Sequence, residues 1–320
     1  MSPSRAERAF FADAQPWGFI LFARNIDNAA QVAALTAELR DVVGRDAPIL
    51  IDQEGGRVQR LRGPVWRQWH PPLDQMARAG PAAMRLRYRL IAHELRAIGI
   101  DVNCAPTADV ARPDTHPFLR NRLYGATPEI VAQAARAVAD GLLAGGVLPV
   151  LKHIPGHGAA RADSHTDLPH VALDRATLDR VDFAAFRALA DLPLAMTAHI
   201  VFDAFGGRLP ATMDPDMIRL IREDIGFGGA LMTDDLSMGA LPGPIGTRAA
   251  RAKAAGCDLI LHCTGDMAEM RAVVEAAGPL DGAAKARTHA AVAARRPPDP
   301  LDIAALEDDL SRLLDGEVYA

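Results

Sequence analysis

The sequence predicts an α/β fold, a single-domain barrel of the TIM type that covers residues 1–320. Short apolar runs alternate with longer amphipathic stretches, which favours parallel strands covered by helices on both faces. Seven such repeats follow one another without a change of composition, as is typical of one closed or nearly closed barrel. A doubly wound open sheet is the alternative, but the first strand–helix turn lacks the G-x-G-x-x-G phosphate loop.

The predicted elements follow in chain order. The first strand covers residues 18–22 and leads to a helix at about 29–43, with Asn28 as its N-cap. The other predicted strands cover residues 48–51, 100–105, 148–151, 193–197, 230–233 and 258–261. The other predicted helices cover about 82–98, a stretch from Pro128 capped by Thr127, and about 214–224, 247–255, 282–294 and 302–314.

Composition and charge exclude several classes of protein. A hydrophobic content of 49% and a charged content of 23% are those of an ordinary globular protein. The net charge is −5 and the sequence has no long basic run, so it shows no basic surface of the kind that binds nucleic acid. Three scattered cysteines form neither a disulfide framework nor a zinc motif. The N-terminus has no signal-peptide pattern and no stretch reaches the ~20 apolar residues of a membrane span, so we expect a cytoplasmic protein.

Polar residues stand at or near the end of each predicted strand. In a barrel of this type the carboxyl ends of all strands face one mouth, and catalytic residues come from several strands. This pattern predicts an active site at that mouth. The residues concerned are Arg24 and Asn25, Asp52 to Glu54, Asn103, Lys152 and His153, His199, Asp234 and Asp235, and His262.

The stretch from Lys152 to His170 carries four histidines and two aspartates within nineteen residues. In an extended loop Asp163 and His165 point to the same side, so the carboxylate could bond one imidazole nitrogen. The other nitrogen would then serve as an acid or base near neutral pH. An Asp–His pair of this kind also occurs often on protein surfaces without any function. A third interpretation is that the histidines bind a catalytic metal. Pro155, Gly156 and Gly158 oppose the helical H-E-x-x-H presentation of a zinc site.

Two acidic clusters complete the candidates. Asp52 lies near Arg57 and Arg60, and this set could hold sugar hydroxyls or form a structural ion pair. Asp234 and Asp235 follow a predicted strand, where side chains alternate in direction. One carboxylate could therefore act as nucleophile or base, while the other caps the next segment or holds a turn.

Taken together, four motifs resemble glycoside hydrolase family three, and within it the bacterial single-domain β-N-acetylglucosaminidases of cell-wall recycling. The resemblance covers roughly residues 17–263. The motifs are residues 18–25 (GFILFARN), 51–60 (IDQEGGRVQR), 152–158 (KHIPGHG) joined to Asp163-Ser164-His165, and 233–238 (TDDLSM).

The resemblance implies a retaining exo-β-N-acetylglucosaminidase that removes terminal GlcNAc from muropeptides such as GlcNAc-anhydroMurNAc. Asp234 matches the nucleophile, His165 the general acid/base and Asp163 its assisting partner. We expect no metal, no cofactor, a saccharide or muropeptide as the only partner, and a monomer. The alternatives are a metal-dependent barrel hydrolase that uses the histidine-rich loop, and a catalytically impaired sugar-binding barrel. The positions that match sugar-holding residues are Asp52, Arg60, Arg122, Lys152 and His153.

The N-terminal segment departs from the family pattern. Family members usually begin with a short apolar strand before the segment that residues 4–14 resemble, and none is found here. Either the start is truncated or the barrel is completed differently. We therefore predict a helix from Ser4 to Asp13 and a barrel that lacks or alters its first strand and is open or irregular beside the strand at Gly18.

Overall fold

A computed structural model describes residues 2–162, 164 and 167–320 of the chain. The chain divides into two compact units. Unit 1 consists of Met1–Pro106, Arg136–Pro149 and Ala294–Ala320, and unit 2 consists of Thr107–Ala135 and Val150–Ala293. The helix α5 (Pro128–Ala144) and the strand β6 (Leu148–Ile154) are each divided between the two.

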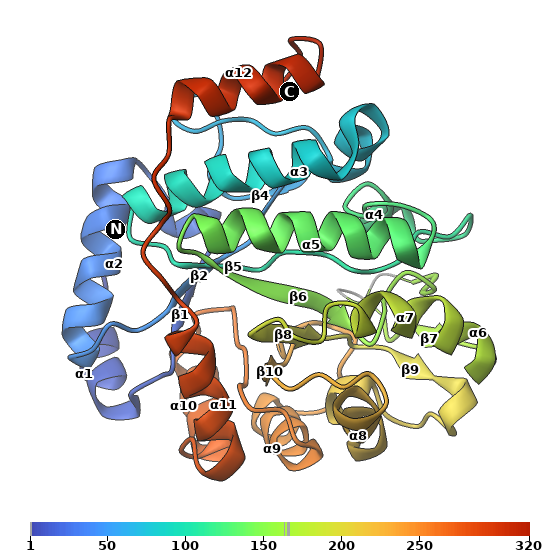
Figure 1. Cartoon of the computed structure of the whole chain (residues 1–320). Helices are drawn as coiled ribbons and strands as arrows, with labels where there is room; N and C mark the ends of the chain where they lie inside the picture. The colour runs from blue at the N-terminus through green and yellow to red at the C-terminus, as the bar shows by residue number, and fades with distance from the viewer. Residues whose placement is uncertain (1, 163, 165–166) are drawn as a thin grey trace. The chain divides into compact units, whose positions relative to one another are not determined.

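The parallel strands of unit 1 pair in the order β1, β2, β5 and the first two residues of β6 (Figure 1). The strands β2 and β5 are buried throughout, as expected for a parallel sheet with helices on both faces. A separate antiparallel pair, β3 with β4, follows β2 in the chain. The bounds are Phe19–Leu21 (β1), Ile49–Ile51 (β2), Gln53–Gly55 (β3), Val58–Gln59 (β4) and Val102–Asn103 (β5).

Helix caps set the starts of the first two helices in unit 1. The Ser4 hydroxyl accepts a hydrogen bond from the Glu7 backbone N–H, and the Glu7 carboxylate accepts one from the Ser4 N–H, which forms a capping box. The Asn28 side chain caps α2 through the Gln31 N–H. Helix α12 packs on α3 (Figure 1). The helices are α1 (Arg5–Ala14), the 3₁₀ turn η1 (Ala23–Asn25), α2 (Ala29–Val43), α3 (Pro72–Ala97) and α12 (Ile303–Leu313).

In unit 2 the remainder of β6 pairs with β8, and β8 pairs with β10, all in parallel. A second parallel pair joins β7 to β9. The bounds of these strands are His170–Val171 (β7), Leu194–Thr197 (β8), Val201–Phe202 (β9) and Ala230–Met232 (β10).

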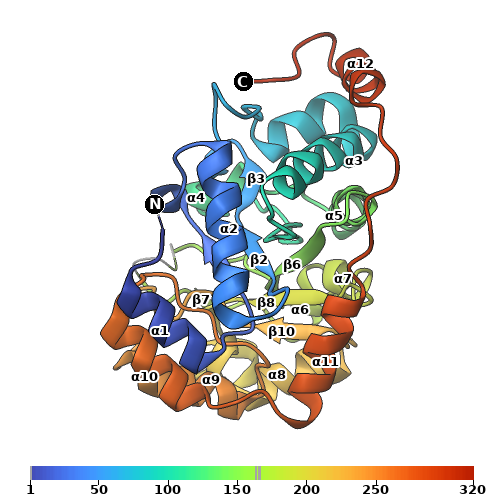
Figure 2. The same ribbon diagram turned by 90° about the vertical axis from the view of Figure 1, so that its left-hand side faces the viewer.

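The helices of unit 2 follow these strands along the chain. Helices α9 and α10 pack side by side (Figure 2). The Asp214 side chain caps α8 by accepting the backbone N–H groups of Asp216 and Met217, and Pro215 takes the first helical position. The helices are α4 (Pro117–Arg120), α6 (Arg175–Arg180), α7 (Asp182–Arg187), η2 (Asp203–Phe205), η3 (Ala211–Met213), α8 (Pro215–Glu223), α9 (Ile245–Ala255), α10 (Met267–Ala277) and α11 (Gly282–Ala293).

The predicted N-terminal helix is confirmed by α1, and β1 stands at one end of the strand order with β2 as its partner. The described residues form six parallel strands in the main order rather than eight regular ones. The seventh predicted strand, at residues 258–261, is wrong in extent: Leu259 makes a single parallel bridge to Met232.

Three other predicted elements differ in extent. The strand β6 continues to Ile154, so that Lys152 and His153 lie within it and not beyond its end. Helix α3 begins at Pro72, about ten residues early, and turns at Gly80, whose φ of 64° permits a kink before Pro81. The helix α4 and the strands β3, β4, β7 and β9 were not predicted, because segments this short carry little periodic signal. The helix α10 was also not predicted, although it is as long as α9.

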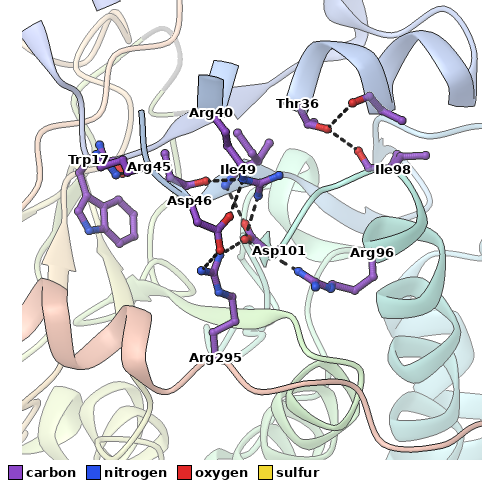
Figure 3. Close-up of polar contacts among 12 residues, drawn as sticks. Trp17, Thr36, Arg40, Arg45, Asp46, Ile49, Arg96, Ile98, Asp101 and Arg295 are labelled. Atoms are coloured by element: carbon purple, nitrogen blue, oxygen red, sulfur yellow. Dashed lines mark hydrogen bonds and ion pairs between the residues drawn. The ribbon is translucent and has the colours of Figure 1, made fainter. Parts of the chain in front are cut away.

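A buried carboxyl group at the start of β5 organises the polar contacts of unit 1 (Figure 3). The Asp101 side chain is fully buried, and its Oδ1 accepts the Ile49 backbone N–H at 2.8 Å. Its Oδ2 accepts from Arg40 at 3.0 Å and from Arg295. These contacts connect β2, α2 and the segment before α12 to one carboxyl group. They give the buried carboxyl group hydrogen-bond donors and give the two mostly buried guanidinium groups an acceptor.

Substituting Asp101 by alanine tests this arrangement. We expect the free energy of unfolding to fall by about 3–5 kcal/mol, because the guanidinium groups of Arg40 and Arg295 lose a buried partner. Asp46 is a matched control, since it pairs with the same two arginines but its side chain is 67% exposed. Asp46→Ala should cost less than about 1 kcal/mol. Equal losses in urea unfolding of the two variants would contradict a central role for Asp101.

Candidate active site

The predicted site residues fall in both units. Asp52 and Arg60 belong to unit 1, whereas Arg122, Lys152, His153 and Asp234 belong to unit 2. Asp163 and His165 lie outside the described residues, although Ser164 between them is described.

In unit 1, Asp52 directly follows β2 and forms an ion pair with Arg60, with 3.0 Å between Oδ2 and Nη2. Both side chains are partly exposed, and the Arg60 guanidinium also lies 5.4 Å from the centroid of the Phe22 ring. Gln53 holds the turn, because its Oε1 accepts the Arg60 N–H at 2.9 Å and its own N–H donates to Asn103 Oδ1. The ion pair considered from the sequence is therefore formed. The role of the pair in binding a sugar stays a prediction.

In unit 2, the carboxylate of Asp109 is completely buried and accepts hydrogen bonds from β6 and from the loop that follows it. It accepts from His153 Nδ1 at 2.7 Å and from the His157 backbone N–H at 2.6 Å. Burial alone would raise the pKa of Asp109, but the His153 ring and these hydrogen bonds outweigh it and hold the pKa below its ordinary value. Since a carboxylate only accepts, His153 carries a hydrogen on Nδ1 and presents Nε2 away from Asp109.

Asp109 was missed by the sequence analysis. It lies in the mainly apolar segment 104–110, six residues after Asn103, and its donors are 44 and 48 residues further along the chain. The available signal was the isolated acid itself, because a carboxylate in an apolar stretch has to find partners elsewhere in the fold.

Asp234 and Asp235 follow β10 and have different surroundings. Asp235 Oδ1 accepts the backbone N–H groups of Ser237 and Cys263, and its Oδ2 accepts the Ser237 hydroxyl at 2.5 Å. Asp235 therefore holds the turn, as predicted for one member of the pair. Asp234 Oδ1 accepts the Asp235 N–H at 2.8 Å. The other influences on the Asp234 carboxylate are the charges of nearby side chains.

The surroundings of Asp234 favour its ionised form. Burial alone would raise its pKa, but His199, His153, the Asp235 N–H and Lys152 together lower it. An ionised carboxylate with only one backbone hydrogen bond recorded in the described residues is suited to act as a nucleophile. Lys152 and His153 are both buried within β6, so the strand pairing in unit 2 brings these predicted residues near Asp234.

His199 is a further residue beside Asp234. It is fully buried, and its Nε2 donates to the backbone carbonyl of Asp235 at 3.0 Å. Its Nδ1 lies 2.7 Å from the hydroxyl of Thr212, which fixes the ring from the other side. Burial lowers the pKa of His199, although Asp234 partly opposes this. The sequence placed His199 at a strand end but gave it no role.

The histidines of the 152–170 stretch do not share one centre in the described part of the chain. His153 bonds to Asp109, His157 Nε2 lies 3.1 Å from Ser164 Oγ, and His170 lies 3.1 Å from Asp203. Within the described residues, no group of three or more His, Cys, Asp or Glu side chains is arranged to hold a metal ion. Arg122, which follows α4, is buried and its charge acts on His157.

The sequence from residue 1 to 294 matches the description "Glycosyl hydrolase family 3 N terminal domain". The chain belongs to glycosyl hydrolase family 3. This match and the similar proteins of known class confirm the predicted family. They also confirm the predicted enzyme class, a glycoside hydrolase of the β-N-acetylhexosaminidase type. This family 3 chain is 38% identical over 271 residues to a β-hexosaminidase of Methylococcus capsulatus, which covers 81% of this chain and 79% of the relative.

Two solved structures resemble this family 3 chain closely. A family 3 β-N-acetylglucosaminidase from Paenibacillus sp. str. FPU-7 has a TM-score of 0.87 at 31% identity, over 98% of this chain and 65% of that one. NagZ from Neisseria gonorrhoeae, in complex with N-trifluoroacetyl-D-glucosamine, has a TM-score of 0.82 at 29% identity, over 100% of this chain and 95% of that one. The predicted α/β, TIM-barrel-like fold class is confirmed by this similarity.

The pH dependence of stability reports on the buried histidines. Burial, with the charges of His153 and Arg122, lowers the pKa of His157 to about 4 despite the opposing effect of Asp109. Between this value and the roughly 6.5 of an unfolded histidine, the unfolded chain binds a proton that the folded chain excludes. The free energy of unfolding therefore falls as the pH drops from about 6.5 towards 4, and this contribution is fully present above that window.

We expect His157→Gln to reduce this dependence, because glutamine keeps an N–H donor but does not titrate. The difference in free energy of unfolding between pH 7 and pH 5 should shrink by on the order of 2 kcal/mol. Urea unfolding of the wild type and the variant at both pH values measures it. The same pH dependence in both proteins would show that His157 is not buried in its neutral form.

Proposed function

We propose that this chain is a retaining exo-β-N-acetylglucosaminidase that removes terminal GlcNAc from muropeptides such as GlcNAc-anhydroMurNAc through a covalent intermediate on Asp234. The observation that carries the proposal is the partly buried carboxylate of Asp234, whose pKa is lowered by His199, His153 and Lys152 against the opposing effect of burial. Family membership and the N-acetylglucosaminidase names of the solved relatives support the substrate class.

In the first step, a carboxylate oxygen of Asp234 attacks the anomeric carbon from the face opposite the glycosidic oxygen. The bond from that carbon to the leaving oxygen breaks, and His165 gives the leaving oxygen a proton, with Asp163 assisting. In the second step, His165 takes a proton from water, which attacks the same carbon and releases Asp234 as a carboxylate. Two inversions at one carbon retain the β configuration.

The other predicted residues are proposed to hold the sugar. Lys152 and His153 on β6 and Arg122 after α4 supply donors in unit 2, and Asp52 with Arg60 supplies an acceptor and donors in unit 1. We also propose that residues 1–320 act as one glycoside hydrolase domain, as a monomer in the cytoplasm, without a cofactor. The described residues include no helix long and apolar enough to cross a membrane.

Hydrolysis of an aryl N-acetyl-β-glucosaminide, measured beside the corresponding glucoside, tests the activity and the N-acetyl requirement together. We expect kcat/KM for the N-acetyl substrate to be higher by about a hundredfold or more, because a site built for the amide loses its hydrogen bonds with the glucoside. The rate should be unchanged by a chelator. Equal rates for both substrates would contradict the proposed specificity, and loss of activity with chelator would favour the metal-dependent alternative.

Asp234→Asn removes the proposed nucleophile while keeping its shape. We expect kcat to fall by about a thousandfold or more, since no covalent intermediate can form. Asp203→Asn is the control, because Asp203 is a partly exposed carboxylate in the same unit that pairs with His170. A fluorinated substrate analogue that keeps the N-acetyl group should leave its sugar mass on the peptide that contains Asp234. Labelling of any other residue would refute the assignment.

A further inference from the structure

Ser164 is the described residue between the two members of the proposed acid/base pair. It is buried, and its hydroxyl oxygen lies 3.1 Å from Nε2 of His157. Its backbone carbonyl accepts the Ala240 N–H at 3.3 Å. Ala240 lies in the segment that follows Asp234, so Ser164 is attached both to the loop after β6 and to the segment after the proposed nucleophile.

His157 is itself firmly held. Its backbone N–H donates to Asp109, and its carbonyl accepts the Ala160 N–H at 3.0 Å. Its ring makes edge contacts with Phe118 and His153, with 5.6 Å and 5.5 Å between the ring centroids. A side chain so placed can fix the position of whatever it bonds to.

The next residue shows how closely this loop is packed. A Cβ atom on Gly158 would lie 2.0 Å from the Val110 carbonyl oxygen, so glycine is needed for the backbone to approach. The Gly158 carbonyl in turn accepts the Thr115 hydroxyl at 2.6 Å. The loop that carries His157 is therefore a packed support for Ser164.

The protonation of His157 is consistent with its donating to Ser164. The pKa of about 4 leaves the ring neutral at neutral pH, with one N–H. Nδ1 is buried and has no hydrogen-bond partner among the described residues. A buried donor without a partner is rarer than an unsatisfied acceptor, so the hydrogen belongs on Nε2, which can donate to the Ser164 oxygen.

We propose that His157 and Ser164 are positioning residues for the acid/base step, and that they act through the hydrogen bond between their side chains. This inference rests on the proposed function, in which His165 protonates the leaving oxygen. Neither residue needs to touch the substrate. They act through the chain on the proton transfer and do not react themselves.

The test uses substrates that differ in their need for a proton. A poor leaving group needs protonation in the first step, whereas a good one, such as a nitrophenol, needs little. We expect Ser164→Ala to lower kcat/KM by about tenfold or more for a poor leaving group and by less than about threefold for a good one. The parameter kcat/KM is used because it reports the first step alone.

Two further variants separate positioning from general damage. His157→Gln keeps an N–H donor in place of Nε2 and should retain most of the activity on both substrates, whereas His157→Leu should behave like Ser164→Ala. Thr288→Ala is the matched control, because it removes a buried hydroxyl that bonds to carbonyls of its own helix α11. Thr288→Ala should leave the ratio of the two kcat/KM values unchanged.

The outcomes distinguish this inference from the proposed function. If His165→Ala shows no leaving-group dependence, the proposed acid role fails. If His165→Ala shows it and Ser164→Ala slows both substrates equally or neither, the positioning role fails while the proposed function stands. Should His157→Leu fail to fold, Ser164→Ala decides the question alone, because it removes a single oxygen atom.

Discussion

The candidate site residues of unit 2 depend on the hydrogen bonds that the buried Asp109 carboxylate accepts. A carboxylate out of contact with water has to be supplied with hydrogen-bond donors by the protein. Here the donors are the ring of His153, near the end of β6, and the backbone of His157, in the loop that follows it. One acid thereby sets the ring orientation of a proposed sugar-holding residue and the course of the loop that leads to Ser164.

The same constraint is met differently at Asp101, eight residues earlier and in unit 1. Asp101 is surrounded by arginines, which use their donors on the carboxyl group and serve stability. Asp109 is served by histidine, whose second ring nitrogen remains directed elsewhere. The difference between a structural acid and an acid that supports chemistry therefore lies in the partner residue and not in the burial, which is complete for both.

The sequence predicted best the elements whose signals lie within one segment of the chain. The helix at Ala29–Val43 and its cap were predicted at their observed bounds, because a cap and an apolar period lie within one segment. The strand β6 was predicted too short, because a buried lysine and histidine inside a strand depend on partners elsewhere. Asp109 was missed for the same reason. The resemblance selected Asp234 as the proposed nucleophile, whereas the alternation of side chains left either aspartate possible.

The charged surroundings of Asp234 follow from the order of the parallel strands. Lys152 and His153 lie on β6, His199 follows β8, and Asp234 follows β10, and these three strands are successive neighbours. Parallel neighbours end at the same edge, so residues separated by more than thirty positions in sequence gather around one carboxylate. A nucleophile whose charge disappears when it bonds to the sugar must be ionised but not tightly paired. Asp235 accepts the turn-forming hydrogen bonds, so Asp234 is not tightly paired. The charges around Asp234 lower its pKa, so its carboxylate is ionised.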